Sequence, residues 1–284
     1  MFDYRYHAIS LAAVLIALTL GILIGVAIGD SNLVSSAKSG IVSNLQSDLE
    51  TARGQAASIA HEQQLEQAAQ NDLYEIAVRD VLAGRKIGLV FFGSPSDPID
   101  VMVREAVAQS GGQLTSVLAV REPLDLAAIA KAATGTQYTA LGQTSGLLRQ
   151  FGIRIGDQLI QGGQLLTRLR RQLLSSFDGQ FGALDGLVVL RANPKSADPE
   201  QTKAINEFQT GMISSANALG IQTVGVELSG AEHSQVSWYT SQNMSSVDDL
   251  DKLTGRAALA FALAGAHGAW GSKPSADGLL PHQP

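Results

Sequence analysis

Serine and aspartate side chains gather in the turn at 93–98, which follows a short apolar run at 86–92. A turn between a buried strand and the next helix is a common ligand site in doubly wound α/β proteins. Neither G-x-G-x-x-G nor the P-loop pattern occurs, and two prolines in this turn lack the backbone N–H groups that a phosphate needs. Ser96 or Asp97 is therefore predicted to cap a helix with Pro98 at its first position. An enzyme using the 93–98 crevice is the alternative.

Three aspartates, Asp248, Asp249 and Asp251, form the tightest carboxylate group. Capping and the helix dipole explain such a group at the start of a helix, and a site for a hard metal ion is the alternative. Cysteine is absent, and the five histidines and four methionines show neither His-x-x-x-His nor Met-x-x-Met spacing. We expect no catalytic residue, no metal ligand and no cofactor.

A basic stretch carries five arginines and one acid, Asp157. The arginines are Arg149, Arg154, Arg168, Arg170 and Arg171. Their long stems are predicted to cover apolar surface on a solvated helix face. An anion or headgroup site is the alternative. The whole chain has net charge −6, the wrong sign for wrapping a nucleic acid, and we expect no nucleic-acid partner.

An apolar segment precedes these residues, with 22 uncharged residues at 8–29. A helix of that length is about 33 Å long and crosses a ~30 Å hydrocarbon layer. A cleaved signal peptide is the alternative, but its apolar region is ordinarily shorter, about 7 to 15 residues. Arg5 and His7 before the segment and Asp30 after it favour a cytoplasmic N-terminus. Residues 1–30 are thus predicted to be a transmembrane signal anchor, with the rest of the chain outside the cytoplasm.

Glycines recur at every fourth position of this segment, at Gly21, Gly25 and Gly29. On a helix they share one face, where a second helix can approach closely. We expect a homodimer through this face. The alternative is that glycine is simply frequent in membrane helices.

Residues 31–83 are predicted to form a coiled-coil stalk, because apolar positions recur at spacings of three and four. One set comprises Leu45, Leu49, Ala52, Ala56 and Ile59, and a second comprises Leu65, Ala69, Leu73, Ile76 and Asp80. Seven acids and three bases make the segment acidic. A solvated face explains this charge, and a docking surface for a basic partner is the alternative. The candidate docking residues are Glu50, Glu62, Glu66, Asp72 and Glu75.

Residues 84–268 are predicted to form an α/β domain, because short apolar runs alternate with helical patterns. The expected strands are 86–92, 114–120, 186–191, 221–228 and 235–240. The expected helices are 99–111, 143–177, 198–219 and 247–268. Apolar strands buried on both faces indicate a Rossmann-like, mostly parallel sheet with helices on both faces. Residues 269–284 are expected to be a C-terminal tail.

Five segments resemble the mycobacterial copper transport protein B family of actinobacterial envelope proteins. They lie at 10–15, 20–25, 82–90, 247–259 and 276–281. The resemblance implies an envelope protein, associated with the outer membrane, that removes copper or limits its accumulation. Six residues of the terminal motifs are expected to be structural: Asp248, Asp251, Gly255, Arg256, Asp277 and Gly278. Direct copper binding is implied by the resemblance alone.

Two functions follow from these observations. The resemblance implies a membrane-anchored protein that assists copper export or tolerance. The residues themselves favour a non-enzymatic, dimeric adaptor whose coil and α/β domain bind an envelope partner; some relatives resemble partners in division or cell-wall hydrolase control. A single helix cannot enclose an aqueous path, and the continuous apolar strands are unlike those of an outer-membrane barrel.

Overall fold

The computed structural model describes residues 4–29, 31–143, 146–193 and 198–281. The chain divides into two compact units, Met1–Gln67 and Ala68–Pro284, each of which is considered by itself. The expected domain limits at residues 30, 83 and 268 stay predictions. Asp30 and the side chain of Arg5, on which the expected membrane orientation depends, lie outside the described residues.

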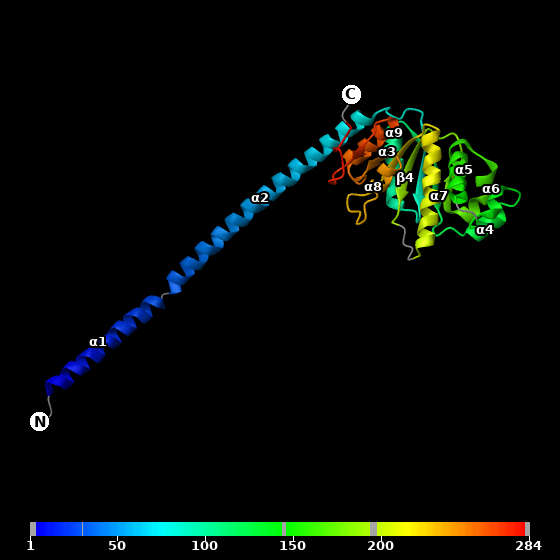
Figure 1. Cartoon of the computed structure of the whole chain (residues 1–284). Helices are drawn as coiled ribbons and strands as arrows, with labels where there is room; N and C mark the ends of the chain where they lie inside the picture. Colours follow the sequence, from blue (N-terminus) through cyan, green and yellow to red (C-terminus); the bar gives the residue numbers. More distant parts are fainter. Residues whose placement is uncertain (1–3, 30, 144–145, 194–197, 282–284) are drawn as a thin grey trace. The chain divides into compact units, whose positions relative to one another are not determined.

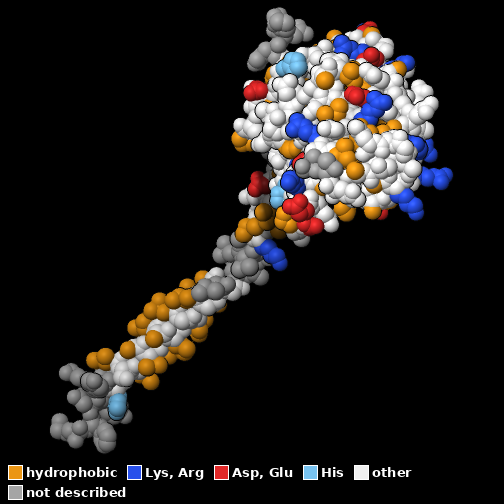
Figure 2. Space-filling model, turned by 45° about the vertical axis from the view of Figure 1, so that its right-hand side comes forward, with side chains coloured by type: hydrophobic (Ala, Val, Ile, Leu, Met, Phe, Trp, Pro, Cys, Tyr) orange, Lys and Arg blue, Asp and Glu red, His pale blue; other side chains and the backbone are white. Residues whose placement is uncertain are grey.

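The first unit begins with helix α1, Tyr4–Ile28. Among the described residues, His7–Ala27 is the one helical stretch long and apolar enough to cross a membrane, with a mean hydropathy of 2.7 and none of it buried. Figure 2 shows hydrophobic side chains along this helix. Gly21 and Gly25 have nothing within 4 Å of a Cβ placed on them, so within this chain their face is open.

Helix α2, Ser31–Val78, is 48 residues long and continues into the second unit. From Ile41 to Leu73 its large apolar side chains are exposed, among them Leu45, Leu49 and Leu65. The five candidate docking acids are exposed as well. Only near its end does α2 meet the core of the second unit, where Tyr74 and Val78 are buried.

The second unit contains a sheet with the order β3-β2-β1-β4-β5-β6-β7, seven strands among the described residues. All neighbours are parallel except β2 and β3. The strands are β1 Lys86–Phe92, β2 Gln113–Val120, β3 Leu174–Gly179, β4 Gly186–Arg191, β5 Gln222–Val226, β6 Ser245–Val247 and β7 Ala269–Trp270. The predicted mixed α/β fold with a mostly parallel sheet is confirmed.

Helices cover both faces of this sheet (Figure 1). They are α3 Asp97–Gln109, α4 Leu126–Ala132, the 3₁₀ turn η1 Gln137–Ala140, α5 Leu147–Gln161, α6 Gln164–Leu173, α7 Pro199–Ala218, α8 Val236–Ser241 and α9 Leu253–Ala264. Strand β1 alternates between two cores, as successive side chains of a strand must. Val90 and Phe92 join the core under α5 and α7, whereas Leu89 and Phe91 join the core under α3, α9 and the end of α2.

Glycines allow α5 and α7 to pack with their backbones in contact. A Cβ on Gly152 would lie 2.3 Å from the carbonyl oxygen of Phe208, and one on Gly211 would lie 2.2 Å from that of Arg149. Gly156 is similarly close to the carbonyl oxygen of Met212, at 2.7 Å. No larger side chain fits at these three positions without moving a helix.

Three sequence predictions of local structure are wrong. Residues 235–240, expected as a strand, form α8, because Val236 and Tyr239 are buried three residues apart and the Tyr239 ring covers Gly225. The single helix predicted at 143–177 is two helices, α5 and α6, which are separated at Gly162 and Gly163. The second ends at Leu173, after which β3 pairs antiparallel with β2. The predicted helix at 247–268 begins at Leu253, because Val247 belongs to β6.

Residues 269–284 were expected as a tail, and they contain β7. The Trp270 side chain is buried in the core under α9. Residues 282–284 lie outside the described part of the chain.

Candidate functional site

A cavity of about 650 Å³ lies at the carboxyl ends of β4 and β5. Ile99, Leu190 and Leu228 contribute apolar side chains to its lining. The charged residues of the lining are Arg191, Glu227, Glu232 and Asp251. Strands β2 and β4 pair with opposite sides of β1, so the order in which strands are added to the sheet reverses at β1, next to β4. Ligands of open α/β sheets bind at such an edge, and this cavity is therefore the candidate site.

Arg191 is the last residue of β4 and is 9% exposed. Its Nε donates to Oε1 of Gln209 at 2.8 Å, its Nη2 donates to Oδ1 of Asn206 at 2.6 Å, and its Nη1 donates to Oε1 of Gln235. The guanidinium carbon lies 4.6 Å from the ring centre of Trp238, a cation–π distance. Neutral amides and an indole therefore hold this buried cation in place, although burial lowers its pKa.

Glu122, just beyond β2, is linked to Arg191 through an amide. The fully buried Gln209 donates from Nε2 to Oε1 of Glu122 at 2.5 Å while its own Oε1 accepts from Arg191. Burial raises the pKa of Glu122, and the Gln209 hydrogen bond and the charge of Arg191 oppose the rise. The link joins the ends of β2 and β4 across β1.

The 93–98 turn places Gly93 close to Glu122, and helix α3 begins within the same turn. Gly93 has φ +105°, and a Cβ on it would lie 3.5 Å from Oε2 of Glu122. Ser96 is at the N-cap of α3 as predicted, but its side chain makes no capping hydrogen bond. Asp97 is the first helical residue, one position before Pro98. In the described chain neither Ser96 nor Asp97 lines the cavity.

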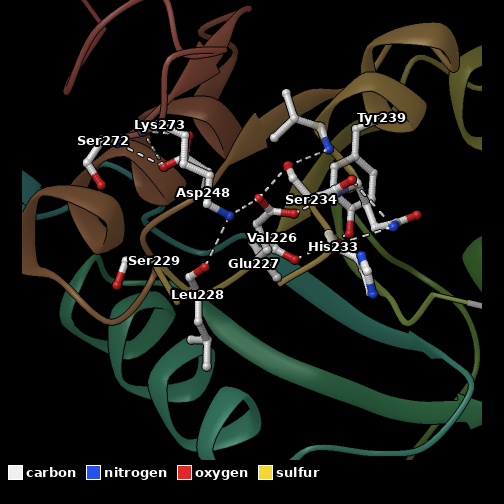
Figure 3. A network of polar contacts seen from close by, with 12 residues as sticks. Val226, Glu227, Leu228, Ser229, His233, Ser234, Tyr239, Asp248, Ser272 and Lys273 are labelled. Carbon is white, nitrogen blue, oxygen red and sulfur yellow. Dashed lines mark hydrogen bonds and ion pairs between the residues drawn. The ribbon is translucent and has the colours of Figure 1, made fainter. Parts of the chain in front are cut away.

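Glu227 also lines the cavity and comes directly after β5 (Figure 3). Its side chain is 5% exposed and accepts hydrogen bonds from Oγ of Ser234 at 2.7 Å and the backbone N–H of Gln235 at 2.8 Å. The ammonium of Lys273 forms an ion pair with the same carboxylate and also donates to the carbonyl of Leu228 at 3.3 Å. A buried carboxylate is thus paired with a mostly buried ammonium.

Asp248, Asp249 and Asp251 have different surroundings. Asp248 accepts from the backbone N–H groups of Ser272 and Lys273, at 2.8 Å and 3.3 Å. Asp251 accepts from the N–H and the hydroxyl of Ser229, both at 2.7 Å. The buried Asp249 side chain accepts no hydrogen bond from a described residue, and Lys252 lies 3.9 Å away. The structure therefore does not direct the three carboxylates at one point.

The other motif residues make contacts within the second unit. A Cβ on Gly255 would lie 2.1 Å from the carbonyl oxygen of Asp249, so only glycine fits there. Arg256 pairs with Glu105 at 3.2 Å. Asp277 accepts from the N–H of Ala269 at 2.8 Å, and the carbonyl of Gly278 accepts from Gly271 at 2.9 Å. These last two contacts hold the C-terminal segment against β7.

Among the residues that the structure describes, no three or more His, Cys, Asp or Glu side chains form a group that could hold a metal ion. His233 is exposed on the loop after β5 and lines the cavity beside Gln235. The polar atoms of Arg191 and Glu227 are engaged by their neighbours in the chain, so the network fixes the wall of the cavity.

Sequence reasoning did not identify Arg191, Glu227, Gln209 or Glu122. A signal was present for Arg191 and Glu227, since Arg191 ends the run Leu-Val-Val-Leu and Glu227 follows Val-Gly-Val. A charge at the carboxyl end of a buried parallel strand lies at the ligand-binding edge of the sheet. Gln209 carries no such signal, because it lies within α7 and its role depends on the packing of that helix.

The family described as copper transport outer membrane protein, MctB, matches residues 1–281, essentially the whole chain. No curated protein sequence matches the chain.

Proposed function

The chain belongs to the MctB family of copper transport outer membrane proteins, and from this membership we propose that it acts in copper export or copper tolerance at the cell envelope. The match over residues 1–281 is the observation that carries the proposal, because it includes both the apolar helix and the α/β unit. Copper is the cargo in this proposal.

We propose that α1 anchors the protein as a single membrane span with a cytoplasmic N-terminus, which leaves the second unit outside the cytoplasm. The unburied apolar stretch His7–Ala27 supports the span. The positive charges before it in the sequence support the orientation. One helix cannot surround a water-filled path, so transport by this protein requires an oligomer or a second protein.

We infer that the second unit, with its Rossmann-like arrangement, acts without catalysis. The polar atoms of Arg191 and Glu227 form hydrogen bonds with other residues of the same unit, which favours a rigid binding surface. A catalytic acid or base needs access to the proton that it transfers, and Glu227 is enclosed by Ser234, Gln235 and Lys273.

A second candidate function is that of a dimeric adaptor, favoured by the exposed apolar positions of α2. Leu45, Leu49, Ile59 and Leu65 are each about half exposed or more, at 61%, 49%, 54% and 59%. A helix of this length with an uncovered apolar stripe is stable in water when a second helix covers the stripe. We propose that two copies pair as a coiled coil and that the acids Glu50 to Glu75 bind a basic envelope protein.

Copper accumulation in cells tests the first function. A strain lacking this protein should accumulate copper and grow poorly in copper medium, and the full chain should restore both phenotypes. The variant Leu49→Asp/Ile59→Asp, tested in the same strain, places charges in the apolar stripe of α2 and leaves the second unit unchanged. If the natural chain restores both phenotypes and the variant does not, the copper function requires pairing of α2. A strain whose copper content does not change when the protein is absent would contradict the copper function.

A competition titration of the full chain in detergent, with Cu(I) and Cu(II) against chelators of known affinity, separates the two functions. Stoichiometric binding tighter than about micromolar, roughly 8 kcal/mol, would make the copper role direct. Absence of binding, together with restored copper tolerance in cells, would favour the adaptor.

A further inference from the structure

Two arginines from different helices line one cavity at the corner between α5 and α6. Arg154 comes from α5 and Arg168 from α6, and the cavity, here called the α5–α6 cavity, has a volume of about 390 Å³. In the described part of the chain neither arginine forms a salt bridge. Arg168 donates from Nη1 to the carbonyl of Thr134 at 3.4 Å, a long contact that leaves most of its donors free.

The charge around this cavity opposes the charge of the chain. Helices α5 and α6 carry five arginines and one acid, Asp157, in a protein of net charge −6. Asp157 lines the cavity, and its carboxylate already accepts the hydroxyl of Ser215 at 2.5 Å. Two guanidinium groups that share a cavity repel each other, and an anion between them relieves that repulsion.

The remaining wall adds hydrogen-bond donors. Oε1 of the buried Gln158 accepts from the backbone N–H of Leu166 at 2.8 Å, which leaves the amide Nε2 of Gln158 as a donor. Gly163 borders the cavity without a side chain, and a Cβ there would lie 2.3 Å from Cδ of Gln158. The Gln158 side chain therefore packs directly against Gly163 in the wall of the cavity, and only glycine fits at this position.

We propose that the α5–α6 cavity binds a phosphate group through Arg154 and Arg168. Guanidinium groups bind phosphate with paired, charge-assisted hydrogen bonds, and two of them from different helices can hold separate oxygens. The volume admits the phosphate together with part of the molecule that carries it. Such a group is supplied either by a soluble phosphorylated molecule or by an anionic lipid headgroup.

Calorimetric titration of the full chain in zwitterionic detergent with inorganic phosphate tests the proposal. We expect saturable binding at one site per chain. The variant Arg154→Gln/Arg168→Gln should weaken it by at least about tenfold. The control Arg149→Gln/Arg171→Gln removes the same charge from the same helices outside the cavity, and it should change the affinity by less than about twofold. Equal weakening by the two variants, or no saturable binding by the natural chain, overturns the proposal.

Two further measurements complete the test. If the double variant does not fold, Gln161→Glu places a negative charge on the exposed rim of the cavity; it should weaken phosphate binding, and unchanged affinity would contradict the site. Titration with glycerol 3-phosphate and with glycerophosphoglycerol separates the sources. Tighter binding of glycerol 3-phosphate, a monoester, indicates that the site takes a soluble phosphorylated molecule. Tighter binding of glycerophosphoglycerol, a diester, indicates that it takes a lipid headgroup.

Discussion

The glycines of α1 and those of α5 show the same spacing but have different surroundings. Gly21 and Gly25 in α1 and Gly152 and Gly156 in α5 are each four residues apart, so each pair shares a helix face. A Cβ on Gly152 would meet a backbone oxygen of α7 at 2.3 Å, whereas a Cβ on Gly21 would meet nothing within 4 Å. Small residues at this spacing indicate a close helix approach, and the structure identifies the partner only for α5.

The contrast extends to the two units. The second unit encloses its apolar side chains in two cores and pairs the buried Glu227 with Lys273. The first unit leaves the apolar side chains of α1 and α2 uncovered. Substitutions in the second unit should therefore change the free energy of unfolding, and substitutions in the first should change association. The predictions below test this division.

The largest expected effect is at the buried ion pair. Lys273→Met leaves the Glu227 carboxylate buried without its cation, which should lower the free energy of unfolding by about 3–5 kcal/mol. Chemical denaturation of the full chain in detergent measures it. The exposed Lys131→Met is the control and should cost below about 0.5 kcal/mol. Glu227→Gln/Lys273→Met should recover part of the loss, and a double variant as unstable as the sum of the single ones would show that the pair is not coupled.

A substitution at the α5–α7 contact should be nearly as damaging. Gly152→Ala forces a methyl group toward the Phe208 carbonyl, and the helices must separate at a cost of about 3 kcal/mol. Gly54→Ala in α2 is the matched control, because nothing lies within 4 Å of a Cβ there and alanine favours a helix by ~1 kcal/mol. The thermal melting temperature of the second unit should fall with the first change alone. An unchanged melting temperature for Gly152→Ala would mean that the two helices are not in backbone contact.

The difference between the units also explains what the sequence could predict. Strands β1, β2, β4 and β5 were located within a few residues, because buried parallel strands are continuous apolar runs. Strand β6 was missed because Ser245 and Ser246 are polar, and their burial depends on neighbouring strands. The stretch 236–240 alternates Val, Trp and Thr as a strand does, yet packing over Gly225 makes it α8. The cavity network was missed because Gln209 and Glu122 meet only after the sheet and α7 have assembled.

The glycine face of α1 should affect association and leave folding unchanged. The chain has no cysteine, so one introduced as Ala17→Cys reports the approach of two α1 helices by disulfide crosslinking in membranes. Gly21→Leu/Gly25→Leu should reduce the crosslinked dimer about tenfold, or ~1.4 kcal/mol, with the melting temperature of the second unit unchanged. Ala12→Leu, on the opposite side of the helix, is the control. Equal crosslinking in all variants would contradict a dimer through this face.

The smallest expected effect concerns Asp249, a buried carboxylate whose oxygens have no hydrogen-bond partner among the described residues. Burial and the neighbouring charge of Asp248 raise its pKa above the ordinary value of 3.8, although Lys252 opposes the rise. An acid whose pKa is higher in the folded than in the unfolded state binds its proton more tightly when folded, so its ionisation costs stability. The cost is present above the folded-state pKa and disappears as the pH falls through that value toward 3.8. Asp249→Asn should therefore stabilise the protein at pH 8, by less than about 1 kcal/mol, and the gain should shrink in acid. The control variant is Asp72→Asn, which removes an exposed carboxylate of α2. A gain that is independent of pH would mean that the pKa of Asp249 is the same in the folded and the unfolded state, and it would contradict a raised pKa for this buried carboxylate.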